Sequence, residues 1–132
     1  MIINTLYKTD TIIDGIKYNP PSKIFNYGQS IELTWKNQNN NLHNDNGPAI
    51  ISYYPNGNIS YKLWCANGKC HNENGPAYIE YDENGNVAYK ECYINDKLHN
   101  ENGPAIIGYD EDGNIIRQEY WENGIRIKWK LN

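Results

Sequence analysis

The chain has 132 residues, enough for one domain with a modest core, and 39% of them are hydrophobic. Its net charge of −4 is uneven, because residues 1–70 hold six Lys and four acidic residues, whereas residues 71–132 hold six Lys or Arg and twelve acidic residues. The acidic second part lacks the basic stripe that binds nucleic acids and anionic lipids, and it favours a partner with a basic patch.

Residues 1–41 are the least regular part, and we interpret them as an N-terminal cap with a half-repeat inside a single domain of residues 1–132. A hairpin is predicted over residues 11–18, bent at Asp14-Gly15. Residues 30–36 alternate apolar and polar side chains, which predicts a half-buried strand. The half-repeat is indicated by Gly28 and Trp35, which match Gly57 and Trp64 at an offset of 29 residues.

A seven-residue motif, His-Asn-(Asp/Glu)-Asn-Gly-Pro-Ala, then occurs three times with a period of 28 residues. Similarity at a fixed period predicts an array of stacked structural units. The motifs begin at His43, His71 and His99, in units that span residues 42–69, 70–97 and 98–125, and residues 126–132 complete the last strand.

Within each unit, Pro-Ala opens a strand, an Asn-Gly or Asp-Gly pair follows, and a second strand leads to a second turn pair. Asn-Gly and Asp-Gly favour type I′ hairpin turns, since both residues tolerate a positive φ. The predicted fold is therefore all-β, an antiparallel meander of repeated β-hairpins. The first turns are expected at Asn56-Gly57, Asn84-Gly85 and Asp112-Gly113, and the second at Asn67-Gly68, Asn95-Asp96 and Asn123-Gly124.

The copies also predict which face is inside. The first, third and fifth positions of each opening strand read Ala, Ile and Tyr in all three units, so we expect them to pack between units. The intervening, variable positions are expected to meet solvent or a partner. Tyr61 and Tyr89 are expected to continue the inner face. Near Trp64 both neighbouring positions become apolar, which indicates either a bulge or a strand covered on both sides.

The three histidines do not favour a shared metal site. Equivalent residues of a two-stranded repeat lie roughly 9–10 Å apart, whereas ligands lie about 2 Å from a Zn²⁺ ion. We therefore expect each His to fix its corner through hydrogen bonds to the backbone, helped by the following Asn. No metal and no other cofactor is predicted.

Cys65, Cys70 and Cys92 form an odd set without a pairing pattern, which favours free thiols in a reducing compartment. Cys70 and His71 are neighbours that would point to opposite faces of a strand, and no serine-nucleophile or phosphate-loop motif occurs. No catalytic residue is predicted, and the chain is not expected to be an enzyme. Without a signal peptide or a long apolar segment, it is expected to be intracellular and cytoplasmic.

Six aromatic residues are the candidate partner-binding residues. Amphipathic aromatic side chains dominate the binding energy of protein interfaces. The alternative interpretation is that aromatic pairs across strands only hold the sheet together. The six are Tyr54, Trp64, Tyr78, Tyr93, Tyr120 and Trp121.

The unit resembles a MORN-type repeat over about residues 26–131, in the variant with His-x-Glu-x-Gly-Pro-Ala, and is similar to bacterial antitoxin proteins of the YwqK type. Such repeats are abundant in giant DNA viruses of amoebae, and the Asn-, Ile-, Lys- and Tyr-rich composition is typical of an AT-rich genome. The resemblance implies an elongated antiparallel sheet used for protein contacts. Some MORN proteins associate with membranes, but the acidic, 28-residue units here depart from that pattern.

These observations favour a non-enzymatic protein–protein interaction module, a viral adaptor or host-factor-binding protein in the host cytoplasm. Two alternatives stay open: an antitoxin or immunity protein that neutralises an effector, and association with a membrane surface. The expected partner is a protein with a basic patch and not a nucleic acid, and an exposed sheet edge would permit a homodimer.

Overall fold

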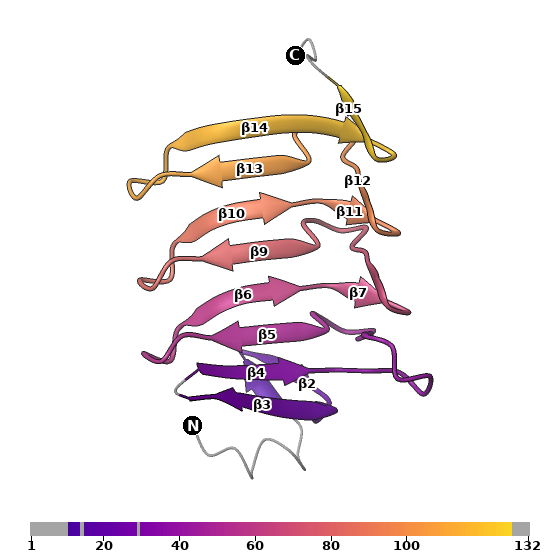
Figure 1. Ribbon diagram of the computed structural model, residues 1–132, viewed down its shortest axis with the longest axis vertical. Helices are drawn as coiled ribbons and strands as arrows, with labels where there is room; N and C mark the ends of the chain where they lie inside the picture. Colours follow the sequence, from indigo (N-terminus) through magenta and orange to yellow (C-terminus); the bar gives the residue numbers. More distant parts are fainter. Residues whose placement is uncertain (1–10, 14, 29, 128–132) are drawn as a thin grey trace.

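A computed structural model describes residues 11–13, 15–28 and 30–127, and these residues form strands, turns and loops without a helix. Nine strands make one antiparallel sheet in the order β15-β14-β13-β10-β9-β6-β5-β4-β3 (Figure 1). Three further two-stranded ladders join β1 with β2, β7 with β8 and β11 with β12. The predicted all-β hairpin meander is confirmed. The strands are β1 (Thr11–Ile13), β2 (Ile16–Tyr18), β3 (Lys23–Tyr27), β4 (Ser30–Thr34), β5 (Ile50–Tyr53), β6 (Ile59–Leu63), β7 (Cys65–Ala66), β8 (Lys69–Cys70), β9 (Tyr78–Tyr81), β10 (Val87–Glu91), β11 (Tyr93–Ile94), β12 (Lys97–Leu98), β13 (Ile106–Tyr109), β14 (Ile115–Glu122) and β15 (Ile125–Ile127).

Each 28-residue unit contributes a long hairpin and a short one. The long hairpins β5–β6, β9–β10 and β13–β14 pair with one another through the main sheet. After β6 and β10 the chain leaves the main sheet and enters the short ladders, which lie along one side of the molecule in Figure 1. In the third unit one continuous strand, β14, pairs with β13 in the long hairpin and with β15 in the short one. The predicted hairpin at residues 11–18 is present, although Asp14 of its turn and residues 128–132 of the predicted last strand lie outside the described residues.

The first turn of each unit is not the predicted type I′ turn. The Tyr54 N–H donates to Asn58 O at 2.8 Å and the Gly57 N–H donates to Tyr54 O at 3.0 Å, so the loop is longer than two residues. A type I turn followed by a left-handed glycine closes such a loop, and Gly57 has a φ of 92°. The second turns do have positive φ at both positions, as at Asn67 (52°) and Gly68 (84°). The equivalent first-turn glycines are Gly85 and Gly113.

A β-bulge after each first turn reverses the side-chain alternation. Ile59 lies opposite Tyr53 and Tyr61 opposite Ser52, so Ser60 is an extra residue without a partner across the hairpin. Ile59 and Tyr61 therefore point to opposite faces. The prediction that Tyr61 and Tyr89 continue the inner face is wrong for this reason. The later hairpins have Ala88 and Ile116 at the bulge position.

The core lies at the N-terminal end of the sheet. The β1–β2 hairpin, behind β3 and β4 in Figure 1, packs against the face that carries Leu33 and Ile51, which we call the hairpin face. We call the opposite side the tyrosine face, because it carries Tyr61 and Tyr78. The core cluster comprises Ile13, Tyr18, Leu33, Trp35, Ile51 and Tyr53, with Ile24, Ile31 and Ile59 packed against it.

The predicted inner isoleucine and tyrosine positions are buried only in the first unit, where the β1–β2 hairpin packs against them, whereas the inner alanines are buried in all three units. Ala49 and Ile51 have no exposed surface, and the alanines of the next two units are buried as well. Ile79 and Ile107, however, are only half-buried on the hairpin face. Ile106, at a position expected to meet solvent or a partner, is buried, since it lies between Glu91 and Glu119 on the tyrosine face.

Candidate protein-binding face

The strand register aligns tyrosines and glutamates on the tyrosine face. Residues directly opposite each other on neighbouring strands share a face of the sheet, so the pairings define rows that run across the strands. Tyrosines and glutamates lie side by side in the middle of both rows. One row contains Glu32, Ser52, Tyr61, Glu80, Tyr89, Gly108 and Arg117, and the next contains Ile50, Leu63, Tyr78, Glu91, Ile106 and Glu119.

Three tyrosine rings form a continuous chain across β6, β9 and β10. The ring centroids of Tyr61 and Tyr78 are 5.7 Å apart, and the planes are tilted by 38°. Those of Tyr78 and Tyr89 are 6.4 Å apart, in an edge-to-face arrangement at 67°. Both distances lie in the range at which aromatic pairs stabilise each other. The chain of rings gives the tyrosine face a rigid aromatic centre, which we call the tyrosine ladder.

Each ring of the ladder is oriented by a carboxylate. The Tyr61 hydroxyl donates to Glu32 at 2.8 Å. The Tyr78 hydroxyl donates to Glu80 at 2.9 Å, and the Tyr89 hydroxyl donates to Glu91 at 2.6 Å. Hydrogen bonds to a charged acceptor are stronger than neutral ones. The phenol groups are therefore fixed as donors to their own sheet.

The same surroundings favour the protonated phenols of Tyr78 and Tyr89. Burial raises the pKa of Tyr78, and the hydrogen bond to Glu80 raises it further. Burial and the hydrogen bond to Glu91 raise the pKa of Tyr89 to about 12. Neutral phenols beside carboxylates leave the negative charge of this part of the face on the glutamates.

At the C-terminal end the acidic charge is compensated by arginine. Arg117 contacts Glu119 at 3.0 Å, and its guanidinium lies 5.8 Å from the centroid of the Tyr89 ring. Arg126 contacts the other oxygen of Glu119 at 3.3 Å. The negative charge beside the tyrosine ladder therefore lies on Glu32, Glu80 and Glu91.

The structure brings two of the predicted partner-binding residues together. Tyr78 belongs to the tyrosine ladder, and the charge of Glu91 contributes to its raised pKa. Tyr93 lies beside the same carboxylate, since burial first and a hydrogen bond to Glu91 second raise its pKa. These two residues therefore border one acidic centre.

The other four lie elsewhere. The Tyr54 hydroxyl donates to the backbone oxygen of Tyr81 at 2.6 Å, which ties two neighbouring turns together. Trp64 is half-buried where the chain passes from β6 to β7. Tyr120 and Trp121 lie at the end of β14, opposite Ile127 and Arg126 of β15.

Tyr61 and Tyr89 of the tyrosine ladder were not among the residues predicted from the sequence, and neither were the acceptors Glu32, Glu80 and Glu91. The bulge brings both tyrosines to this face, and the bulge residues differ too much in polarity to give a pattern. The Asn-Gly-Asn sequence of the preceding turns is the signal that could have predicted the change of face, because a turn longer than two residues changes the register of the strand that follows.

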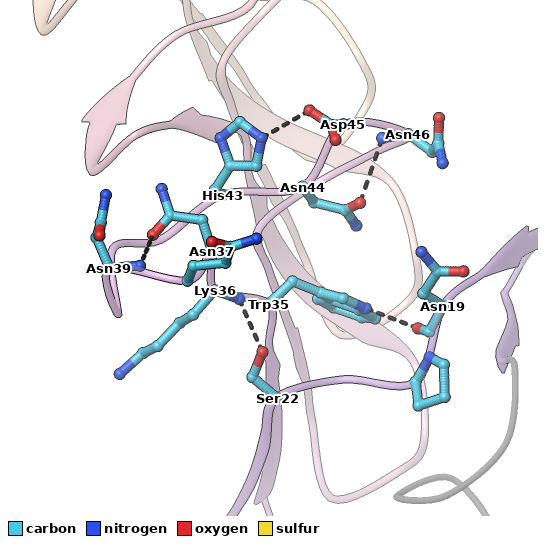
Figure 2. Close-up of a pocket in the computed structure, with 12 residues that line it drawn as sticks. Asn19, Ser22, Trp35, Lys36, Asn37, Asn39, His43, Asn44, Asp45 and Asn46 are labelled. Atoms are coloured by element: carbon cyan, nitrogen blue, oxygen red, sulfur yellow. Dashed lines mark hydrogen bonds and ion pairs between the residues drawn. The ribbon is translucent and has the colours of Figure 1, made fainter.

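The histidines fix the corners of the units, as predicted. Nδ1 of His43 accepts the backbone N–H of Asn67 at 3.0 Å, so Nε2 carries the proton and lies 2.6 Å from Asp45. The following Asn44 donates to Pro48 O at 2.9 Å and accepts the N–H of Asn46 at 3.2 Å. Figure 2 shows this loop. Both imidazole nitrogens have structural partners, as do those of His71 and His99 in the equivalent loops.

A polar trough of about 490 Å³ lies beside this first loop (Figure 2). Trp35 lines it, and its indole N–H donates to Asn19 O at 2.8 Å. Lys36 donates its backbone N–H to Ser22 at 2.9 Å. These two hydrogen bonds join the loop to the segment between β2 and β3. The described residues contain no group of three His, Cys, Asp or Glu side chains that could hold a metal ion.

Comparisons with protein-family models, with characterised proteins and with solved structures find no match for this chain. The resemblance to MORN-type repeats therefore stays a prediction. Among the described residues, no helix is long and apolar enough to cross a membrane.

Proposed function

We propose that this chain is a non-enzymatic binding module that holds a protein partner on the tyrosine face. The observation that carries the proposal is the tyrosine ladder, in which Tyr78 contacts both Tyr61 and Tyr89 and each of the three donates to a glutamate. Tyrosine supplies a large, rigid and amphipathic contact area at a low cost in side-chain entropy.

The ladder is organised before a partner arrives. Its phenol groups already donate to Glu32, Glu80 and Glu91, so little rotamer freedom remains to be lost on binding. The carboxylates give this part of the face a negative potential. A segment with lysine or arginine side chains complements that potential, and opposite charge accelerates association.

The proposed partner is therefore a protein with a basic surface segment. An adaptor that captures a cellular protein and an immunity protein that covers a basic effector would use the same chemistry. The identity of the bound protein distinguishes these two forms, whereas the residues that contact it are the same in both.

Alanine substitutions on opposite faces test the proposal. The full chain, carrying an affinity tag, is crosslinked in its native cells, and the captured protein is then produced and its dissociation constant measured. Tyr78→Ala and Tyr89→Ala are expected to weaken binding by about tenfold or more, the loss typical of a central interface residue. Tyr109→Ala is the matched control, because Tyr109 belongs to the same sheet but lies on the hairpin face, two residues after Ile107. There the Lys90 Nζ is 5.6 Å from the centroid of its ring.

Charge is tested separately. Glu80→Gln and Glu91→Gln keep the shape of the face and remove negative charge, so they are expected to reduce the association rate and its dependence on salt. Equal loss in the Tyr109→Ala control, or unchanged binding in all the tyrosine-face variants, would contradict the proposed face. Binding of the wild-type chain to anionic vesicles in low salt would instead support membrane association.

A further inference from the structure

Two of the three cysteines face each other across a short hairpin. Cys65 of β7 pairs directly with Cys70 of β8, and the next pair is Ala66 with Lys69. The type I′ turn at residues 67–68 closes this hairpin with positive φ at both positions. All three cysteines are free thiols in the structure.

The hydrogen bonding of the hairpin places this pair at a site of close approach. The His71 N–H donates to Trp64 O at 3.1 Å, on one side of the cysteine pair. Hydrogen-bonded and non-hydrogen-bonded pairs alternate along antiparallel strands, so Cys65 and Cys70 form a non-hydrogen-bonded pair with Cα atoms about 4.5 Å apart. A disulfide requires a Cα separation of about 4.4–6.8 Å. The bond can therefore form without unpairing β7 from β8.

This arrangement occurs in one unit alone. The equivalent pairs are Tyr93 with Leu98 and Trp121 with Arg126. Cys92 stands at the break between β10 and β11, a position different from that of either paired cysteine. The opposed thiols are thus an addition to the repeated architecture and are not required by it.

The two thiols differ in access and in acidity. Cys65 is buried, whereas Cys70 is half-buried. A hydrogen bond from Cys65 lowers the pKa of Cys70, and the same interaction together with burial raises the pKa of Cys65. The thiolate is the reactive form of cysteine. Cys70 is therefore the nucleophile of the pair, and Cys65 is the thiol that resolves the oxidised product.

We propose that Cys65 and Cys70 are a redox site at which a peroxide closes a reversible disulfide across the β7–β8 hairpin. The Cys70 thiolate attacks one oxygen of hydrogen peroxide, the O–O bond breaks, and Cys70 sulfenic acid forms while the released hydroxide takes a proton to become water. The Cys65 sulfur then attacks the Cys70 sulfur, the S–O bond breaks, and the Cys65 proton leaves with the hydroxide as a second water. One peroxide is reduced, and two thiols are oxidised to one disulfide.

The backbone of β8 is fixed for this reaction. The Cys70 N–H donates to the Asp96 carboxylate at 2.6 Å, and the Asp96 N–H donates back to Cys70 O at 2.9 Å. These bonds hold the attacking residue against the following unit. The proposal rests on this hairpin and does not depend on the tyrosine face.

Thiol mapping of the folded full-length chain tests the proposal. The reduced protein is treated with hydrogen peroxide, the remaining thiols are alkylated, and peptides are analysed by mass spectrometry without reduction. We expect one alkylated cysteine, Cys92, and a disulfide between Cys65 and Cys70 that dithiothreitol reverses. Cys92→Ser is the matched control and should form the same disulfide.

Single variants separate the two roles. Cys65→Ser should leave a sulfenic acid on Cys70 that dimedone traps, whereas Cys70→Ser should react more slowly and yield less of the trapped product at Cys65. Alkylation of both paired cysteines after peroxide treatment would overturn the proposal. A disulfide that involves Cys92, or equal reactivity of the two single variants, would overturn the assigned roles.

Discussion

Nδ1 of His71 accepts the backbone N–H of Asn95 at 3.1 Å, so the motif that begins a unit holds the turn that ends the same unit. Asn95 has a φ of 49°, in the left-handed region that asparagine tolerates. His43 with Asn67 and His99 with Asn123 repeat the bond, each at 3.0 Å. The recurrent histidine is thus a clamp between two segments that are 24 residues apart.

Removing this clamp should destabilise the fold. His71→Ala leaves the N–H of Asn95 without its acceptor, and we expect the free energy of unfolding to fall by about 1 kcal/mol. Urea denaturation measures the change. Glu73→Ala is the control, because it removes only an exposed contact 3.5 Å from Nε2 and should change stability by less than about 0.5 kcal/mol. Equal effects of the two variants would argue against the clamp.

The N-terminal end should contribute most of the packing energy. Leu33 and Ile51 are completely buried beneath the β1–β2 hairpin, so Leu33→Ala or Ile51→Ala should each cost about 2–5 kcal/mol. Ile116, with 69% of its surface exposed at a bulge, is the matched position, and Ile116→Ala should cost less than about 0.5 kcal/mol. Denaturant midpoints of the three variants make the comparison. A loss at Ile116 as large as that at Leu33 would show that the core extends along the whole sheet.

Stability should decrease at alkaline pH through the tyrosine ladder. The pKa of Tyr89 is raised from an ordinary value of 10.0 to about 12, chiefly by burial. Folding therefore favours the protonated phenol, and this contribution is complete below pH 10 and is lost as the pH rises from 10 to 12. Denaturation at a series of pH values, with tyrosinate absorbance recorded in parallel, measures the loss. Tyr89→Phe should flatten the profile, and an unchanged profile would contradict the assignment.

The hairpin register itself should be sufficient for disulfide formation. In a variant whose native cysteines are replaced by serine, Tyr93→Cys with Leu98→Cys places two thiols at a directly opposed pair. We expect this double variant to form an intramolecular disulfide under mild oxidation. Tyr93→Cys with Lys97→Cys is the control, since Lys97 lies opposite Ile94 and its side chain points to the other face. Similar closure of both double variants, measured by thiol alkylation, would contradict the geometric argument.

Much of the fold could be predicted because its information is local and repeated. The 28-residue period, the turn pairs and the alternating strands identified the hairpins, and the second turns have the expected positive φ at Asn67 and Gly68. The hydrogen-bonding role of the histidines was also predictable, because equivalent residues of neighbouring units lie too far apart to bind one metal ion. Each of these inferences needs only neighbouring residues and a spacing.

The candidate site was less predictable because one residue per hairpin changes the face of those that follow. Ser60 has no partner across the hairpin, and this moves Tyr61 to the side opposite Ile59. The tyrosine ladder depends on this shift. The contact of Tyr78 with rings on both flanking strands is also a relation between units, which alternation within one strand cannot reveal.

The pairing of β6 with β9 and that of β10 with β13 become identical after a displacement of 28 residues, as Tyr61 with Glu80 and Tyr89 with Gly108 illustrate. The two junctions between the full 28-residue units therefore have the same register. Such a molecule can be lengthened by duplicating one segment or shortened by losing one, with no new type of interface required. The number of units, and with it the length of the surface presented to other molecules, can therefore change while the architecture stays the same.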